Sequence, residues 1–365
     1  MSTQPADLAP DYIRAIAPYV PGKPMTQLAR ETGIAVERIV KLASNENPLG
    51  MSPRARAAVE AALAGLARYP DDFELKAKLS ERTGVAAEGI VLGNGSNDVL
   101  DMVARVFLAP GRSAVLSQYA FAVYPIATQT QGACAIVVPA KDYGHDLDAM
   151  RASIAPDTRV VWVANPNNPT GSFLPFDALH AFIQSVPQDV IVVLDEAYNE
   201  YITPAERVDT TAWLRAFPNL VITRTFSKIF GMAGLRVGYA LTSPEIAGLM
   251  NRVRHPFNCN NLALAAAVAA LDDGAFIAES YELNRAGLMQ ILSGLKRLGL
   301  GHIPAHGNFI AFKVQDAAAV NRALQAQGVI VRPLAGYGMP DHLRVTIGLP
   351  DENQRFLEAL EKALA

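Results

Sequence analysis

One lysine of this chain, Lys228, has neighbours that would make its amine chemically reactive. It follows the apolar run 220–222 and stands directly after Ser227, and Arg236 comes eight residues later in a glycine-rich segment. Apolar surroundings disfavour the ammonium form, so the amine loses its proton more readily. A neutral lysine amine can form a Schiff base with an aldehyde. The hydroxyl, the guanidinium and nearby backbone N–H groups suit a phosphate. An aldehyde and a phosphate on one small molecule indicate pyridoxal 5′-phosphate (PLP).

Two further motifs follow apolar runs that we expect to be strands. Asp195 ends the run 190–194, and Tyr198 comes three residues later. Opposite a pyridine nitrogen, the Asp195 carboxylate would keep that nitrogen protonated, although taken alone it could equally cap a helix. Asn168 lies in the loop 165–171, where it could aim its amide at a ring oxygen. The prolines and glycine of that loop predict by themselves only a turn.

Three weaker signals belong with these motifs. The segment 93–98, with Ser96 and Asn97, connects a short strand to a helix and would favour a phosphate, but it is not a Walker A sequence. Phe121 could stack on an aromatic ring or simply pack in the core. Arg332 and Arg344 lie in or at the end of apolar strands. Each could pair with a structural carboxylate or clamp an anionic group of a substrate.

Composition narrows the classes of function. The 365 residues are 50% apolar and 18% charged, as in a globular protein of about two domains. A net charge of −3 offers no broad electrostatic basis for nucleic acid or an anionic membrane. The N-terminal residues lack a secretory pattern, and the longest apolar run, 262–271, is too short to span a bilayer, so we expect a cytoplasmic protein. Cys134 and Cys259 are expected to be free thiols, and the six histidines lack metal-ligand spacing, so we expect no metal.

The order of the expected elements predicts an α/β fold. Short apolar runs alternate with helices up to residue 194, which indicates a largely parallel sheet covered on both faces. The expected strands are 90–92, 114–116, 135–138, 159–163 and 190–194. Helices at 244–253, 262–271 and 275–298, and strands at 309–312, 329–332 and 343–347, then predict a smaller α+β domain. We therefore divide the chain into an arm with part of the small domain (1–47), a large domain (48–260) and a C-terminal small domain (261–365).

Taken together, these motifs resemble the fold-type I PLP-dependent aminotransferases. The matching residues are Asn168 to Gly171, Asp195 with Tyr198, and Ser227-Lys228 with Arg236. Within that group the chain is similar to the histidinol-phosphate aminotransferase subfamily. This closer likeness depends on the segments 42–50, 68–70, 165–171, 331–334 and 343–348.

The resemblance implies a role for each matching residue. Lys228 would hold the cofactor covalently and move a proton, Asp195 would face the pyridine nitrogen, and Tyr198 and Asn168 would bind the ring oxygen. The implied cofactor-phosphate contacts are Ser96, Asn97, Ser227 and Arg236, with Tyr69 reaching in from a neighbouring subunit, and Phe121 would stack on the ring. For substrates, Arg344 would bind the α-carboxylate, and Arg332 and Tyr19 would contact the phosphate of histidinol phosphate.

The resemblance also implies partners and a reaction. The chain would be a homodimer that transfers an amino group between L-histidinol phosphate and 2-oxoglutarate in histidine biosynthesis, giving imidazole-acetol phosphate and glutamate. An aromatic amino acid aminotransferase of the same subfamily remains the alternative, because phenylalanine, tyrosine and histidinol phosphate all carry flat rings. A PLP-binding regulator without catalysis is a more distant alternative, against which the retained Lys228 argues.

Overall fold

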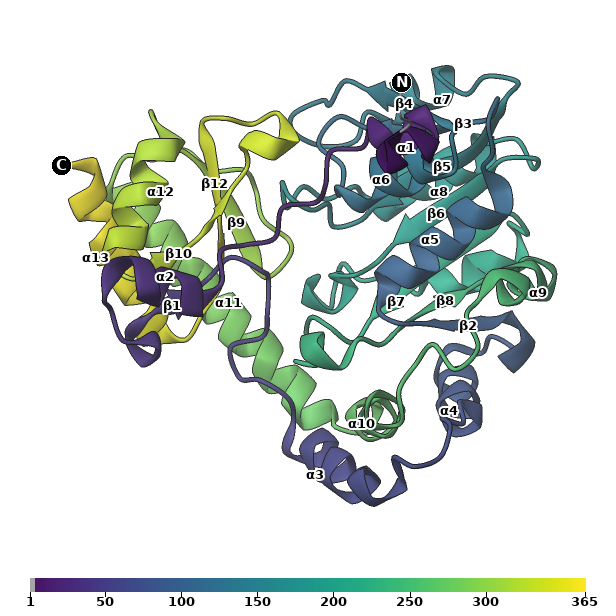
Figure 1. Cartoon of the computed structure of the whole chain (residues 1–365), viewed down its shortest axis with the longest axis horizontal. Coiled ribbons are helices and arrows are strands. Elements are labelled where there is room, and N and C mark those ends of the chain that lie inside the picture. Colours follow the sequence, from purple (N-terminus) through teal and green to yellow (C-terminus); the bar gives the residue numbers. More distant parts are fainter. Residues whose placement is uncertain (1–3) are drawn as a thin grey trace.

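The computed structural model describes residues 4–365 and shows two bodies, each built on its own sheet (Figure 1). The larger body contains a seven-stranded sheet of order β2-β8-β7-β6-β5-β3-β4. Strand β8 runs antiparallel to both of its neighbours, and the other pairs of adjacent strands are parallel. The strands are β2 Ile90–Gly93, β3 Ser113–Ser117, β4 Cys134–Val138, β5 Thr158–Ala164, β6 Ile191–Asp195, β7 Leu220–Thr225 and β8 Gly238–Leu241.

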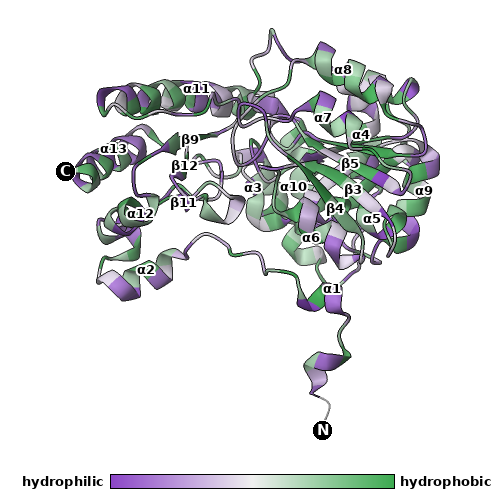
Figure 2. Ribbon diagram, turned by 90° about the horizontal axis from the view of Figure 1, so that it is seen from above, coloured by the Kyte–Doolittle hydropathy of each residue, from purple (hydrophilic) through white to green (hydrophobic). Residues whose placement is uncertain are grey.

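The central strands are apolar on both faces because helices cover both sides of the sheet. In β6, Val192 and Leu194 belong to one buried cluster, whereas Ile191 and Val193 belong to the cluster on the opposite face. Figure 2 shows the same strands as hydrophobic ribbons inside a shell of more polar helices. This doubly covered arrangement is typical of parallel sheets. The predicted α/β fold with a mostly parallel sheet is therefore confirmed.

The helices of the larger body begin close to the positions that the sequence predicts. Helix α3 begins at Pro53, directly after Ser52, whose hydroxyl accepts a hydrogen bond from the Ala55 N–H. Helix α5 begins at Ser96, three residues earlier than predicted from the apolar pattern. The helices of this body are α1 Asp11–Arg14, α3 Pro53–Ala62, α4 Phe73–Thr83, α5 Ser96–Phe107, α6 Val123–Thr130, α7 Leu147–Ala152, α8 Phe176–Ser185, α9 Pro244–Val253 and α10 Asn261–Leu271. Helix α2, Met25–Thr32, belongs with the smaller body, where its Leu28 shares a buried cluster with Ile330.

The smaller body has an antiparallel sheet of order β11-β12-β9 and a separate pair, β1 with β10. Val40 and Leu42 of the N-terminal segment join its buried core. The single strand predicted for 329–332 is wrong: the chain breaks there into β10 and β11, which pair in different sheets. The elements are β1 Val40–Lys41, α11 Gly274–Arg297, β9 Phe309–Lys313, α12 Ala317–Ala326, β10 Val329–Ile330, β11 Arg332–Pro333, β12 His342–Thr346 and α13 Pro350–Leu364.

Helix α10 packs within the larger body, although the sequence assigned it to the smaller one. Ala263, Ala266 and Ala267 are buried in the same cluster as the central strands. Helix α11 then runs from this cluster, through Ile277, to the small-domain core at Ile291 (Figure 1). We propose that the domain division lies between α10 and α11 rather than at residue 261. Within residues 4–365 no single helix is long and apolar enough to cross a membrane. Helices α10 and α11 together have the length and composition of a span, but the chain bends by 83° between them.

Candidate active site

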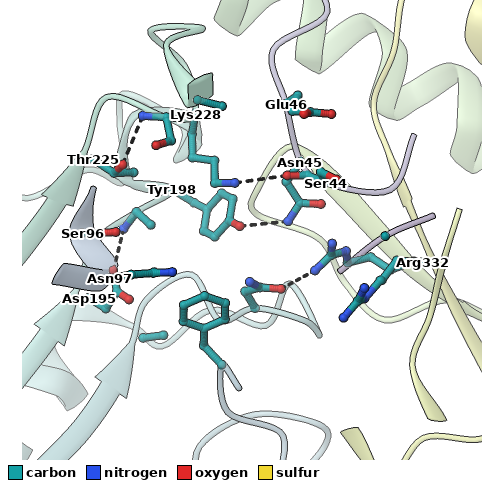
Figure 3. A pocket seen from close by; sticks show the side chains of 18 of the residues that line it. Ser44, Asn45, Glu46, Ser96, Asn97, Asp195, Tyr198, Thr225, Lys228 and Arg332 are labelled. Carbon is teal, nitrogen blue, oxygen red and sulfur yellow. Dashed lines mark hydrogen bonds between the residues drawn. The ribbon is translucent and has the colours of Figure 1, made fainter. Parts of the chain in front are cut away.

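A cavity of about 380 Å³ lies where the two bodies meet, and it is lined by residues from both (Figure 3). This volume is within the range of small-molecule sites. All but one of the site residues predicted from the sequence contribute to its wall. They are Tyr19, Ser96, Asn97, Phe121, Asn168, Asp195, Tyr198, Ser227, Lys228, Arg236, Arg332 and Arg344.

The parallel sheet explains why residues so far apart in the chain meet here. Asp195 is the last residue of β6, and the segments that follow β2, β3, β5 and β7 supply much of the remaining wall. The carboxyl ends of parallel strands lie at one edge of a sheet, which is where ligands bind in open α/β folds. The smaller body closes the cavity from the other side with β11 and β12.

Lys228 extends into the cavity, and its Nζ donates a hydrogen bond to the carbonyl oxygen of Ser44 at 3.2 Å (Figure 3). Burial lowers the pKa of Lys228 to about 8, and the charges of Arg344 and Arg236 act in the same direction. The nearby Glu46 carboxylate opposes this shift. The amine is therefore neutral in far more molecules near neutral pH than an ordinary lysine would be, as a nucleophile or a base requires.

Asp195 and Tyr198 are both buried against the same side of the cavity. The Asp195 Oδ1 accepts a hydrogen bond from the Ala197 N–H at 3.2 Å, and burial raises the pKa of Asp195. The Tyr198 hydroxyl accepts a hydrogen bond from Asn45 Nδ2 at 2.8 Å (Figure 3). Burial raises the pKa of Tyr198 to about 12, so its hydroxyl remains a hydrogen-bond donor.

A second group of wall residues forms a cradle for an anion. Helix α5 starts at Ser96, and the Arg236 guanidinium packs against Gly95 so closely that a Cβ there would lie 2.4 Å from one of its nitrogens. A Cβ on Gly238 would lie 2.5 Å from the Ser96 nitrogen. The two glycines therefore allow a guanidinium and a helix N-terminus to approach one another. Both groups attract phosphate.

Arg344 and Arg332 form the opposite wall. Arg344 donates to Asn168 Oδ1 and to the Ala43 carbonyl oxygen, whereas its buried Nε has no partner within the described chain. The Arg332 guanidinium lies 5.3 Å from the centre of the Tyr19 ring. The two arginines are directly opposite in the β11–β12 pair, where like charges are destabilising. Neither takes part in the ion pairs of residues 4–365. An anionic ligand would relieve this repulsion and supply a partner for Nε.

Side-chain hydrogen bonds hold the loop 165–171 in place. Asn165 exchanges two hydrogen bonds with the backbone of Leu174, at 3.0 and 2.8 Å. Asn167 Nδ2 donates to the carbonyl oxygen of Tyr119 at 2.8 Å. These amides fix the loop at the strand end, so that Asn168 has a defined position in the cavity.

Tyr69 is the one predicted residue that the structure does not bring into the cavity. Its ring is 79% exposed and stacks on Phe257 at a centroid distance of 4.4 Å. Among the wall residues to which sequence reasoning assigned no role are Asn45, Tyr124 and Tyr337. Tyr124 had a recognisable signal, since it lies in an aromatic-rich segment after a predicted strand. Asn45 and Tyr337 reach the cavity only because the N-terminal segment and the smaller body fold over it.

The donor set fits PLP. A lysine of lowered pKa, a buried carboxylate and a guanidinium beside a helix N-terminus would engage the aldehyde, the pyridine nitrogen and the phosphate of that cofactor, respectively. The fold and the site thus define a PLP-dependent enzyme. Residues 37–360 match the family model of aminotransferase class I and II, and the chain belongs to that family.

Individual relatives agree with this assignment. The chain is 71% identical to histidinol-phosphate aminotransferase 1 of Dechloromonas aromatica, over 98% of its own length and 99% of the relative's. It is 62% identical to the protein of the same name in Thiobacillus denitrificans, over 99% and 94%. The solved structure of histidinol-phosphate aminotransferase from Sinorhizobium meliloti, in complex with PLP, is 27% identical and has a TM-score of 0.89, over 98% and 97% of the two chains.

Proposed function

We propose that this transaminase exchanges an amino group between L-histidinol phosphate and 2-oxoglutarate, giving imidazole-acetol phosphate and glutamate. The observation that carries the proposal is the opposed pair Arg332 and Arg344, which faces Lys228 across the cavity. L-histidinol phosphate carries a phosphate and glutamate carries carboxylates, and such a pair could bind either kind of anion. The names of the two relatives, histidinol-phosphate aminotransferase 1, support the same donor.

The two arginines would divide the recognition of substrate. Arg344 is buried and fixed by Asn168 and Ala43, so we assign it the α-carboxylate of glutamate. Arg332 is less buried and lies beside Tyr19, so we assign the two of them the phosphate of histidinol phosphate. Arg332 would also bind the side-chain carboxylate of glutamate, which explains how one cavity accepts both donors. Arginine stays charged at all working pH values, so donors without an anionic group should react poorly.

The remaining wall residues would hold PLP. Ser96, Asn97, Ser227 and Arg236 would bind its phosphate, in the cradle described above. Asn168 and Tyr198 would donate to the ring oxygen, Asp195 would pair with the ring nitrogen, and Phe121 would stack on the ring. When bound there, PLP supplies an electron-withdrawing ring that stabilises negative charge developing on the substrate.

Lys228 would carry the proton that the reaction moves. Its lowered pKa makes the free amine available, and its position in the cavity sets it beside a bound amino acid. The amine would take the proton from the Cα of the amino donor in one half-reaction and deliver a proton to the Cα of the new amino product in the other. A positioned base of matched pKa contributes about 10²–10⁴-fold to the rate. Because one residue both gives and takes the proton, the same cavity serves both half-reactions.

A homodimer is part of this proposal. Tyr69 and Phe257 stack on the surface and are 79% and 55% exposed, and Leu63, Leu66 and Phe73, which flank Tyr69 in the sequence, are exposed too. Exposed apolar clusters of this kind mark contact surfaces. In a dimer built on this face, Tyr69 would contact the cofactor phosphate of the partner, which accounts for its place outside the cavity of its own chain. A cytoplasmic location is also proposed, and the free thiols Cys134 and Cys259 support it.

A panel of amino donors tests the substrate. With 2-oxoglutarate as acceptor, kcat/KM should be greatest for histidinol phosphate and lower for histidinol and phenylalanine, neither of which carries a phosphate. Arg332→Gln should lower kcat/KM for histidinol phosphate about tenfold or more, as expected for a lost hydrogen bond to a charged group. Arg285→Gln is the matched control, because Arg285 lies exposed on α11 and pairs with Glu282. A strong preference of the wild type for phenylalanine would instead identify an aromatic amino acid aminotransferase.

A further inference from the structure

The buried carboxylate of Asp195 has a partner with no role so far. The Tyr124 hydroxyl donates a hydrogen bond to Asp195 Oδ2 at 2.8 Å, while the other carboxylate oxygen accepts from the Ala197 N–H. Tyr124 is fully buried and Asp195 is 5% exposed. In such surroundings a hydrogen bond to a charged group is stronger than one in water, and an unpaired carboxylate is costly.

Tyr124 is itself held in a fixed position. It lies in the first turn of α6, and its ring stacks on Trp162 of β5 with a centroid distance of 5.3 Å and an interplanar angle of 4°. The indole N–H of Trp162 donates to Thr128 Oγ1 at 3.2 Å, further along α6. The Phe121 ring meets the Tyr124 ring in a T-shaped contact, with centroids 5.8 Å apart. A donor held by stacking on Trp162 and by this contact loses little entropy when it binds Asp195.

The pKa shifts of the two groups keep the shared proton on the Tyr124 hydroxyl and off the Asp195 carboxylate. Burial and the neighbouring Asp195 carboxylate raise the pKa of Tyr124 well above its ordinary value, so the phenol keeps its proton and remains a donor. Burial raises the pKa of Asp195, and the bond from Tyr124 acts against that rise. The tyrosine therefore favours the ionised form of a carboxyl group that its surroundings would otherwise protonate.

We propose that Tyr124 is a positioning residue that orients Asp195 and keeps it ionised opposite the ring nitrogen of PLP. This inference rests on the role proposed above for Asp195. Without the phenol, the carboxylate would bind a proton more tightly, and the proton shared with the ring nitrogen would move toward Asp195. The ring would then withdraw electrons less strongly.

The test compares the affinity of apoprotein for PLP in two backgrounds. Tyr124→Phe keeps the stacked ring and removes only the hydroxyl, and it should weaken PLP binding about tenfold, as expected for a hydrogen bond to a charged group. In an Asp195→Ala background the same change should make no difference, because the group through which Tyr124 acts is gone. Tyr201→Phe is the control: Tyr201 is also buried but does not line the cavity. Thermal unfolding of each apoprotein checks that the fold is retained.

A second measurement reports the ring nitrogen directly. The ¹⁵N chemical shift of ring-labelled PLP bound to Tyr124→Phe should move toward that of unprotonated pyridine, whereas Tyr201→Phe should leave it unchanged. Incorporation of 3-fluorotyrosine at position 124 strengthens the donor without removing a contact, so it should move the shift in the opposite direction; this variant decides the matter if Tyr124→Phe does not fold. Equal losses of affinity in both backgrounds, or an unmoved ¹⁵N shift, would overturn the inference. If Asp195→Ala itself binds PLP as tightly as wild type, the role of Asp195 is wrong instead.

Discussion

The lowered pKa of Lys228 leads to a quantitative prediction about how the apoprotein captures PLP. Only the neutral amine attacks an aldehyde. With a pKa of about 8, about 9% of the amine is neutral at pH 7, against about 0.03% for a lysine at its ordinary value of 10.5. Lys228 should therefore react about 300-fold faster than an ordinary lysine at that pH. The rate should rise with pH through a midpoint near 8, where half of the amine is neutral, and level off about one pH unit above that.

Single substitutions of charged residues near Lys228 test the cause of its lowered pKa. Arg344→Gln removes the largest electrostatic cause of the shift, so the midpoint of the pH–rate curve should move upward. Glu46→Gln removes a carboxylate that stabilises the ammonium form, so the midpoint should move downward. Arg285→Gln, on the exposed face of α11, should leave the midpoint unchanged. The titration of free PLP is common to all these proteins, so it cancels in the comparison.

Stopped-flow absorbance of apoprotein mixed with PLP at a series of pH values provides the measurement. Lys228→Ala supplies the baseline, since it lacks the amine. A wild-type midpoint near 10.5 would show that the cavity does not desolvate Lys228. Shifts of the same sign in Arg344→Gln and Glu46→Gln would show that these charges do not act on the amine in the way described.

Three further predictions concern other parts of the structure. Lys228→Ala should still bind PLP through the phosphate and ring contacts but lose about 10²–10⁴-fold in turnover, measured in steady-state assays; retained turnover would exclude Lys228 as the base. Burial lowers the pKa of His145 to about 4, so the folded state resists a proton that the unfolded chain accepts below about 6.5. Stability should therefore fall by up to about 3 kcal/mol as the pH drops from 6.5 to 4, and urea unfolding of His145→Gln should show a smaller fall; an equal fall in both proteins would assign the acid sensitivity to other groups. Sedimentation should show a dimer that Tyr69→Glu weakens, because a charge would be buried in the contact face; a wild-type monomer with full activity would contradict the proposed assembly.

Much of the site was predictable because its chemistry follows local rules. Asp195 ends an apolar strand, Asn168 and Ser227 each follow one, and parallel strands bring their carboxyl ends to one edge. The glycine-rich segment before α5 likewise indicated an anion site from local sequence alone. The doubly covered sheet was equally predictable, since strands apolar on both faces require helices on both sides.

Local rules of this kind could not predict contacts between segments that are distant in the sequence. Arg332 and Arg344 were ambiguous in the sequence, and their direct opposition arises from the register of β11 and β12, in a region where the expected strand 329–332 divides between two sheets. The bond from Tyr124 to Asp195 joins side chains 71 positions apart.

The amino-acid sequence thus specified the reactive groups and the strand ends that carry them, because hydrophobic patterning and side-chain chemistry are local properties. The packing of the smaller body and the N-terminal segment over that sheet edge determined which arginine is buried and which tyrosines reach the cavity. It also determined how far the Lys228 amine is removed from water. Burial and charge–charge distances arise from the whole fold, and they set the pKa values on which the chemistry of the site depends.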